Sequence, residues 1–339
     1  MPEAKPIIIV GAGLAGLACA HELQKGGFNS LVLEASDAVG GRVRTDLVDG
    51  FLLDRGFQVY LSAYPEAGQL LDLVELDLRP FRAGALVFDG RKLCRVMDVF
   101  RHPQYLLGSA LAPIGSLADK LRVAKLRFQR HPNRASSDPT TAKFLADFGF
   151  SPRMVDGFFR AFYGGIFLER DLRTSSRMFQ FTFQMFSHGS ATLPNRGMQS
   201  IPNQLAARLT AKSIRLNCAV VEVDPTSVLL ESGERIVAST VVLATDASTT
   251  RRFFPDDANT SQPAWRAVTG LYFSALESPL KEAIIALNGV GTGLVNNVCV
   301  ISDVAPGYAP AGKSLISVSV LGIPTMESLE TVVLAELLA

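Results

Sequence analysis

Cysteine and histidine are scarce in this chain of 339 residues, which has four of each. Cys19, Cys94, Cys218 and Cys299 lie far apart in the sequence, without a C-x-x-C pair and without a histidine at ligand spacing. We therefore expect neither a disulfide framework nor a zinc site, and no metal is predicted. Unpaired cysteines favour a reducing compartment, so the sequence predicts a cytoplasmic protein.

Long apolar runs are missing as well. Residues 6–20 carry no charge, but this stretch is shorter than the roughly 18 to 20 apolar residues that span a bilayer. We expect neither a signal peptide nor a transmembrane helix. A composition of 48% apolar and 19% charged residues suits a globular protein with two domains.

The chain opens on the pattern of a βαβ unit between residue 7 and Glu34. A β-branched run predicts a buried parallel strand, apolar residues at helical spacing follow, and a second apolar run ends at Glu34. This pattern predicts an α/β fold that starts with a parallel sheet.

The first turn of that unit has the spacing G-x-G-x-x-G. Gly11 permits the tight turn, Gly13 lets the backbone approach a pyrophosphate, and Gly16 lets the helix pack closely on the strand. The N–H groups at the helix start, at Leu14 and Ala15, then face the phosphates, where the helix dipole favours negative charge. The turn predicts an adenine dinucleotide site.

Two later features decide among the dinucleotides. Glu34 follows 18 residues after the last of these glycines, where it can bind a ribose 2′-OH and would repel the 2′-phosphate of NADP. Gly40-Gly41 with Arg42 behind it offers a second clamp on the pyrophosphate, with a forked guanidinium. NAD dehydrogenases have no need of this second clamp, so it favours FAD.

Several blocks of the chain resemble the flavin amine oxidase superfamily, which includes monoamine oxidases, protoporphyrinogen oxidases and phytoene desaturases. The resemblance rests on the opening unit as far as VGGRVRT and on LDRGFQVYLSAYPEAGQLL, LPNRGMQSIPNQLA, NCAVVEV and STVVLATDAS. It implies that FAD is held at the ribose by Glu34, at the phosphates by Arg42 and at the adenine by the backbone of Val220. It also implies that Gly56-Phe57-Gln58 lies against the flavin ring. Motifs and resemblance together predict these cofactor-binding residues: Gly11, Gly13, Leu14, Ala15, Gly16, Glu34, Ala35, Gly41, Arg42, Gly56, Phe57, Gln58 and Val220.

The resemblance further implies removal of a hydride onto flavin N5, from a C–H bond or from carbon next to nitrogen, with oxygen or a quinone as electron acceptor. The block at 56–73 is more similar to carotenoid desaturases than to monoamine oxidases, which favours a lipophilic substrate. No catalytic residue is predicted, because the four histidines are scattered and no carboxylate dyad stands out. Gln58 and Tyr60 are the nearest candidates for lining the flavin.

Phenylalanine is concentrated in one region, since 11 of the 21 lie between Phe144 and Phe186. This density predicts the core of a helical cap, and it also suits an apolar tunnel for a lipophilic substrate. Ser151 followed by a proline predicts a helix start, and Gly164-Gly165 predicts the end of that helix.

Residues 79–134 are strongly basic, with 12 Lys or Arg and three Asp in a chain of net charge +1. Within them, residues 116–130 predict a helix with a capping box between Ser116 and Asp119. Its expected apolar face is Leu117, Leu121, Ala124 and Phe128, and its expected wet side is Lys120, Arg122, Lys125, Arg127 and Arg130. The segment 105–130 can be a solvated helix face, a peripheral contact with an anionic membrane, or an attractor of an acidic substrate. Nucleic acid is not a predicted partner.

The predicted architecture is a discontinuous α/β protein. Residues 1–78 and 195–255 form an FAD-binding Rossmann-like domain, and residues 79–194 and 256–339 form a mixed-sheet and helical substrate domain. The chain ends in TMESLETVVLAELLA without the Gly-Asp block and small-residue helix with which relatives close over the flavin. We expect either a fragment or a chain that has lost part of its flavin site. Alternatives are a carrier on the same fold that uses no flavin, and an NAD-dependent dehydrogenase.

Overall fold

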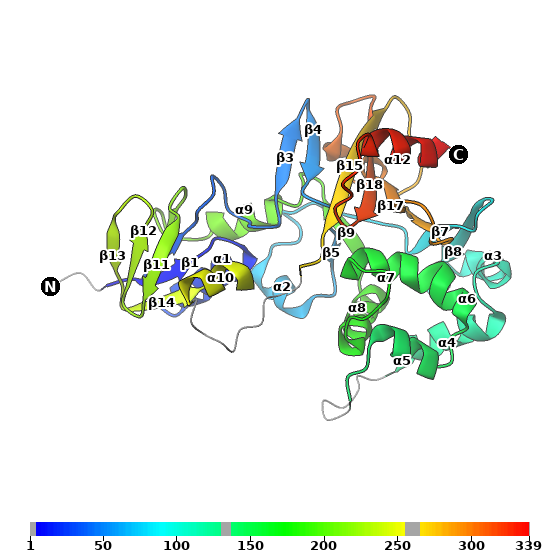
Figure 1. Ribbon diagram of the computed structural model, residues 1–339, viewed down its shortest axis with the longest axis horizontal. Coiled ribbons are helices and arrows are strands. Elements are labelled where there is room, and N and C mark those ends of the chain that lie inside the picture. The colour runs from blue at the N-terminus through cyan, green and yellow to red at the C-terminus, as the bar shows by residue number, and fades with distance from the viewer. Residues whose placement is uncertain (1–4, 130–136, 255–264, 339) are drawn as a thin grey trace. The chain divides into compact units, whose positions relative to one another are not determined.

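The structure is a computed structural model that describes residues 5–129, 137–254 and 265–338. The chain divides into two compact units, each assembled from three segments (Figure 1). Unit 1 contains residues 1–46, 66–76 and 196–265. Unit 2 contains residues 47–65, 77–195 and 266–339.

Unit 1 is built on a parallel sheet with the strand order β10-β2-β1-β14. The strands are β1 (Ile7–Val10), β2 (Ser30–Leu33), β10 (Ile214–Arg215) and β14 (Thr240–Leu243). All three pairings are parallel, and Ile7 lies opposite both Ser30 and Thr240. A parallel sheet is covered on both faces, which explains the continuous apolar run of β1.

Each face of this sheet has its own cover (Figure 1). Ile9 and Val32 pack with helices α1 (Leu14–Lys25) and α9 (Ser200–Ala207). Ile8 and Leu33 pack with an antiparallel meander of β11 (Val220–Asp224), β12 (Ser227–Leu230) and β13 (Arg235–Val237). Helix α10 (Ala247–Phe253) belongs to this unit, and α2 (Pro65–Leu70) starts at its boundary. Gly233, in the turn between β12 and β13, has φ +86°.

Unit 2 contains a mixed six-stranded sheet with the order β15-β18-β17-β16-β7-β8. The strands are β7 (Gly84–Phe88), β8 (Leu93–Met97), β15 (Val268–Ala275), β16 (Ile285–Asn288), β17 (Val295–Val300) and β18 (Ser314–Leu321). Only the β16–β7 pairing of this sheet is parallel. A hairpin of β3 (Thr45–Val48) and β4 (Phe51–Asp54) and a three-stranded sheet of β5 (Tyr60–Leu61), β9 (Ala191–Pro194) and β6 (Leu78–Pro80) are the smaller sheets.

Helices cover the β7–β16 part of this sheet with a phenylalanine-rich layer. They are α3 (Leu106–Leu111), α4 (Leu117–Phe128), α5 (Thr141–Asp147), α6 (Pro152–Met154), the π-helical turn η2 (Val155–Phe159), α7 (Arg160–Phe167) and α8 (Ser176–His188). Phe159, Tyr163 and Phe179 are almost completely buried and pack against Val87 and Leu287. The layer is therefore a helical core, as one of the two interpretations of the phenylalanines predicts. The remaining elements are the 3-10 turns η1 (Pro103–Tyr105) and η3 (Pro306–Tyr308), α11 (Ile301–Val304) and α12 (Leu329–Leu338).

The glycine pair in this layer does not end its helix. Helix α6 starts at Pro152 with Ser151 as its cap, as predicted, but α7 continues past Gly164 and Gly165 to Phe167. A Cβ on Gly165 would lie 2.9 Å from the Asn296 side chain. The glycines therefore allow close packing on β17, and the helix ends instead at Leu168, which has φ +55°.

Helix α4 forms with its predicted capping box, but its apolar face points the other way. Leu117, Leu121 and Phe128 share one face, and they are 63%, 67% and 72% exposed. The inward side instead carries Leu126, which is buried in the phenylalanine-rich core. It also carries Lys120, whose Nζ donates to the carbonyls of residues 110 and 112, and Arg127, which binds a carboxylate and a carbonyl. Arg130 lies outside the described residues. The partly buried carbonyls need donors, which apolar side chains cannot supply.

Residues 47–65 lie in unit 2, whereas the predicted boundaries place them in the cofactor domain. Asp54, at the end of β4, is buried and accepts a hydrogen bond of 2.7 Å from the hydroxyl of Tyr308. Its carbonyl accepts a second one, of 2.6 Å, from Tyr272. These partners follow more than 200 residues later, so neighbouring sequence does not reveal them. No helix in the described ranges is long and apolar enough to cross a membrane.

Candidate nucleotide-binding site

The turn between β1 and α1 requires glycine at two positions because a side chain there would clash with the backbone of the same unit. Gly11 has φ +103°, and a Cβ on it would lie 3.0 Å from the carbonyl oxygen of Ala244. A Cβ on Gly16 would lie 1.9 Å from the carbonyl oxygen of Gly11, so any side chain there would separate helix and strand. Both glycines are explained by folding alone.

Gly13 differs from these two. Its backbone is extended, with φ −69° and ψ 176°, and no atom of the described residues lies within 4 Å of a Cβ built on it. The chain itself therefore does not require glycine here. The open space beside Gly13 is the room that a close ligand would occupy.

The start of α1 borders this space. Leu14 and Ala15 are exposed, no side chain of the described chain caps the helix, and its first turn contains no acidic residue. The first N–H groups of a helix have no intrahelical partner, and the helix dipole makes this end positive. The first turn of α1 can therefore bind an anion.

Glu34 is held beside the same turn. Its Oε2 accepts the N–H of Ala12 at 2.7 Å, and its Oε1 accepts the N–H and the hydroxyl of Ser36 at 3.0 and 2.7 Å. These bonds fix the carboxylate at the end of β2. Oε2 has accepted a single donor and can accept a hydroxyl as well.

The second glycine pair packs directly on the first turn. Gly40 forms a parallel bridge with Gly13, and its N–H donates to the carbonyl of Ala12 at 2.8 Å. A Cβ on Gly41 would lie 3.4 Å from the Cα of Gly13. Arg42 follows with an exposed side chain whose guanidinium carbon lies 5.9 Å from the centre of the Trp265 ring. Two glycine turns distant in sequence thus meet at one place.

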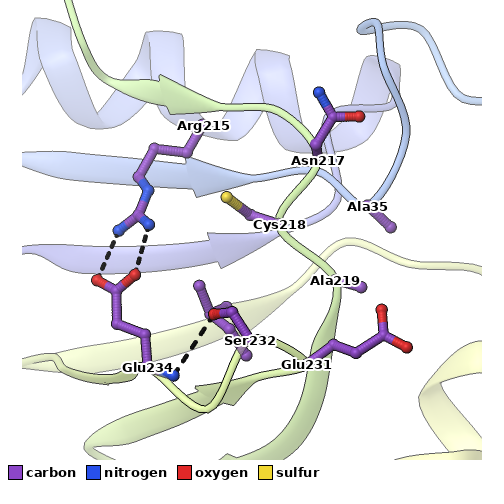
Figure 2. A pocket seen from close by; sticks show the side chains of 9 residues that line it. Ala35, Arg215, Asn217, Cys218, Ala219, Glu231, Ser232 and Glu234 are labelled. Atoms are coloured by element: carbon purple, nitrogen blue, oxygen red, sulfur yellow. Dashed lines mark hydrogen bonds and ion pairs between the residues drawn. The ribbon is translucent and has the colours of Figure 1, made fainter.

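Ala35 and Val220 lie near the backbone of Glu34. Ala35 is exposed and borders an open pocket of about 610 Å³, whose wall includes the Arg215–Glu234 ion pair at 2.6 Å (Figure 2). The N–H of Cys218 donates to the carbonyl of Glu34 at 2.8 Å, and Val220 begins β11 two residues later. Among the predicted site residues, only Ala35 borders this pocket.

Gly56, Phe57 and Gln58 belong to unit 2 and have contacts of their own there. Gly56 has φ +90°, which only glycine adopts readily. Phe57 meets Phe81 edge to face at 6.2 Å, and the side-chain amide of Gln58 donates to the carbonyl of Arg55 at 3.1 Å. The buried Asp54 anchors the start of this loop.

Tyr60 is the other candidate for lining a flavin. It is 5% exposed, and its hydroxyl has no hydrogen-bond partner among the described residues. Burial raises the pKa of this hydroxyl, and the neighbouring Tyr64 adds to the effect. Burial therefore favours the neutral form of Tyr60.

Gln199 supports the site and was missed by the sequence patterns. Its side-chain amide donates to the carbonyl of Val39 at 2.7 Å, and its N–H donates to the hydroxyl of Thr45 at 3.0 Å. Gln199 thereby binds the chain on both sides of the Gly40-Gly41 loop, although it lies 160 residues from Val39 in the sequence. LPNRGMQSIPNQLA contains it, but no spacing rule connects it to that loop.

A parallel βαβ unit with an open glycine turn, a fixed carboxylate after the second strand and a second glycine turn defines a Rossmann-like dinucleotide-binding domain. The family model for flavin-containing amine oxidoreductases matches residues 14–337, and the chain belongs to this family. The family indicates a flavin cofactor and an oxidoreductase. The predicted fold class and family are confirmed.

Individual relatives match shorter parts of the chain. The chain is 43% identical over 75 residues to protoporphyrinogen oxidase 2, chloroplastic/mitochondrial, from Arabidopsis thaliana, covering 22% of this chain and 14% of the relative. It is 33% identical over 85 residues to 15-cis-phytoene desaturase from Synechococcus elongatus, covering 24% of this chain and 18% of the relative. These alignments span less than a fifth of the relatives' length.

The fold is shared more widely. A solved structure of an oxidoreductase from Methanosarcina mazei has a TM-score of 0.77 at 20% identity, covering 98% of this chain and 83% of that chain. At this identity the likeness establishes the fold alone.

Proposed function

We propose that this chain is an FAD-dependent oxidoreductase and that unit 1 holds the ADP portion of FAD at the start of α1. One observation carries the proposal. The fold gives no steric reason for glycine at position 13, and the open space beside Gly13 is bordered by uncapped N–H groups of α1. A diphosphate fits both features, since it needs close backbone approach and donors for its oxygens.

The chain's own residues would divide the binding of FAD among them. The amides at Leu14 and Ala15 bind phosphate oxygens, and Arg42 adds charge from the second glycine turn. Glu34 Oε2 accepts a ribose hydroxyl, and the backbone of Val220 contacts the adenine. Gly56-Phe57-Gln58 lies against the flavin ring, as the family resemblance implies.

FAD, when bound, supplies a ring that accepts a hydride at N5 and passes the electrons to oxygen or a quinone. The protein then needs to orient the substrate over the ring. The proton that is lost along with the hydride would be released to water. We propose a lipophilic substrate of the desaturase or protoporphyrinogen oxidase kind. The relatives of those names and the phenylalanine-rich layer of unit 2 support this class.

Titration with FAD tests the cofactor proposal. Wild type should bind FAD, seen as flavin absorbance that stays with the protein on gel filtration and as quenched flavin fluorescence. Arg42→Ala should weaken binding by about tenfold, or 1.4 kcal/mol, because it removes one charge-assisted contact. The matched control is Arg235→Ala, which removes an arginine paired with Glu222 and Asp224 in the same unit and should leave FAD binding unchanged.

A folded wild-type protein that takes up no FAD would contradict this proposal and favour a carrier. Tighter binding of NAD than of FAD would favour a dehydrogenase. The substrate class is tested separately, by anaerobic bleaching of the bound flavin with polyenes, porphyrinogens and amines. Bleaching by small amines alone would contradict the lipophilic substrate but leave the cofactor proposal intact.

A further inference from the structure

Large apolar side chains are exposed together on α3, α4 and the turn before them. They are 50% to 82% exposed, and we call them the α3–α4 patch: Phe100, Leu106, Leu107, Leu111, Leu117, Leu121 and Phe128. Exposed apolar groups of this size are usually scattered singly on a protein surface, and a continuous patch marks a contact surface.

Contacts connect the elements that carry the patch. The rings of Phe100 and Phe128 meet edge to face at 5.6 Å, which joins the turn to the end of α4. The ammonium group of Lys120 donates to the carbonyls of Ala110 and Ala112 at 2.6 and 2.9 Å, which ties the start of α4 to the end of α3. The patch therefore extends over two helices, which are tied to each other, and the turn before them.

The surroundings of the patch are cationic. Residues 99–129 contain five Lys or Arg and one acidic residue, Asp119, which is completely buried. Lys125 and Arg153 are exposed and form no ion pair with a carboxylate of the described residues. Arg153 lies close enough to Lys120 to lower the pKa of that ammonium group, in addition to the larger effect of burial. Arg101 and Arg127 pair with Asp98, just before this stretch, and Arg122 pairs with Asp119. Lys125 and Arg153 are therefore the exposed cations near the patch that the described carboxylates leave for an anion.

We propose that the α3–α4 patch docks on an anionic lipid bilayer, with its leucine and phenylalanine side chains in the headgroup region and Lys125 and Arg153 against lipid phosphates or carboxylates. An exposed apolar face with flanking basic residues is the pattern of an interfacial helix. A second copy of the chain is a poorer occupant, because a symmetric contact would place the same cations opposite each other.

Sedimentation with liposomes tests the docking. Wild type should bind vesicles of phosphatidylcholine with 30% phosphatidylserine, our chosen probe, more tightly than vesicles of phosphatidylcholine alone. Leu107→Ser/Leu111→Ser should weaken binding to the anionic vesicles by about tenfold or more, because two exposed leucines no longer enter the lipid. The matched control is Val74→Ser/Ile323→Ser, which changes two apolar residues of 90% and 75% exposure outside the patch and should bind as wild type does.

A second variant tests how much the basic residues contribute to vesicle binding. Lys125→Gln/Arg153→Gln should weaken binding about fivefold for each cation removed, and raised salt should shrink that difference. All four side chains are exposed, so far-UV circular dichroism should be unchanged in both patch variants.

Two results would overturn the proposal. One is a wild-type protein that ignores anionic vesicles, or binds them as well after the leucine substitutions as before. The other is a concentration-dependent dimer in sedimentation velocity that Leu107→Ser/Leu111→Ser abolishes, which would assign the patch to self-association.

Discussion

Substituting alanine at Gly13 should separate cofactor binding from folding. Gly13 has φ −69° and ψ 176°, which alanine adopts without strain, and no described atom lies within 4 Å of the added Cβ. We expect the free energy of unfolding of the FAD-free protein to change by less than about 1 kcal/mol. The change should be an increase, because alanine lowers the conformational entropy of the unfolded chain. In the same variant the methyl group occupies the space that we assign to the diphosphate. The Kd for FAD should rise at least about tenfold, or 1.4 kcal/mol.

Gly16→Ala provides the contrast within the same turn. Its Cβ would lie 1.9 Å from the carbonyl oxygen of Gly11, and this neighbour is backbone that cannot rotate away. We expect destabilisation of about 3 kcal/mol, in the range of overpacked core substitutions. Urea unfolding followed by circular dichroism measures stability, and fluorescence titration measures FAD binding. The reasoning is refuted if Gly13→Ala binds FAD as tightly as wild type, or if it destabilises the protein as much as Gly16→Ala.

Three further predictions concern unit 2. Asp119 is completely buried, and although burial raises its pKa, hydrogen bonds from the backbone and hydroxyl groups of two serines outweigh this and hold the pKa below its usual value. Asp119→Asn should therefore lower the free energy of unfolding by about 3 kcal/mol at neutral pH. The difference from wild type should shrink below about pH 4, because the carboxylate of the unfolded wild-type chain then takes up a proton that the folded state does not, and a pH series of urea midpoints checks this. Tyr308→Phe should lower the free energy of unfolding by about 2 kcal/mol, because it removes the hydrogen bond of 2.7 Å that the hydroxyl donates to the buried Asp54 carboxylate, and a loss below about 0.5 kcal/mol by urea unfolding would contradict the prediction. Leu168→Gly should raise the thermal midpoint, because it relieves about 1 kcal/mol of strain at φ +55° at the end of α7, and a lower midpoint would contradict the prediction.

Local sequence was sufficient for the first βαβ unit. Its strands, helix and turn follow from the apolar pattern and from glycines whose roles are set by atoms a few residues away, as at Gly16. The position of Glu34 follows in the same way, because the end of a parallel strand lies at the edge where the neighbouring strand also ends. Chemistry predicted that the second glycine turn serves the same diphosphate as the first, whereas the direct bridge between Gly40 and Gly13 is known only from the structure.

Other features depended on partners far away in the chain. Gln199 reaches Val39 across 160 positions, and Asp54 binds Tyr308 across 254, so no window of sequence contains both members. Gly165 is small because Asn296 packs against it, although the glycine pair by itself predicts a helix end.

Helix α4 shows most clearly what the sequence determined and what the tertiary structure determined. Its sequence by itself determined that residues 117–128 form a capped helix with one apolar and one cationic face, because capping and the 3.6-residue period act within a few turns. Only the tertiary structure decided which face turns inward. Leu126 packs in the phenylalanine-rich core, and carbonyl and carboxylate groups on the same side accept hydrogen bonds from Lys120 and Arg127. This orientation leaves Leu117, Leu121 and Phe128 in solvent.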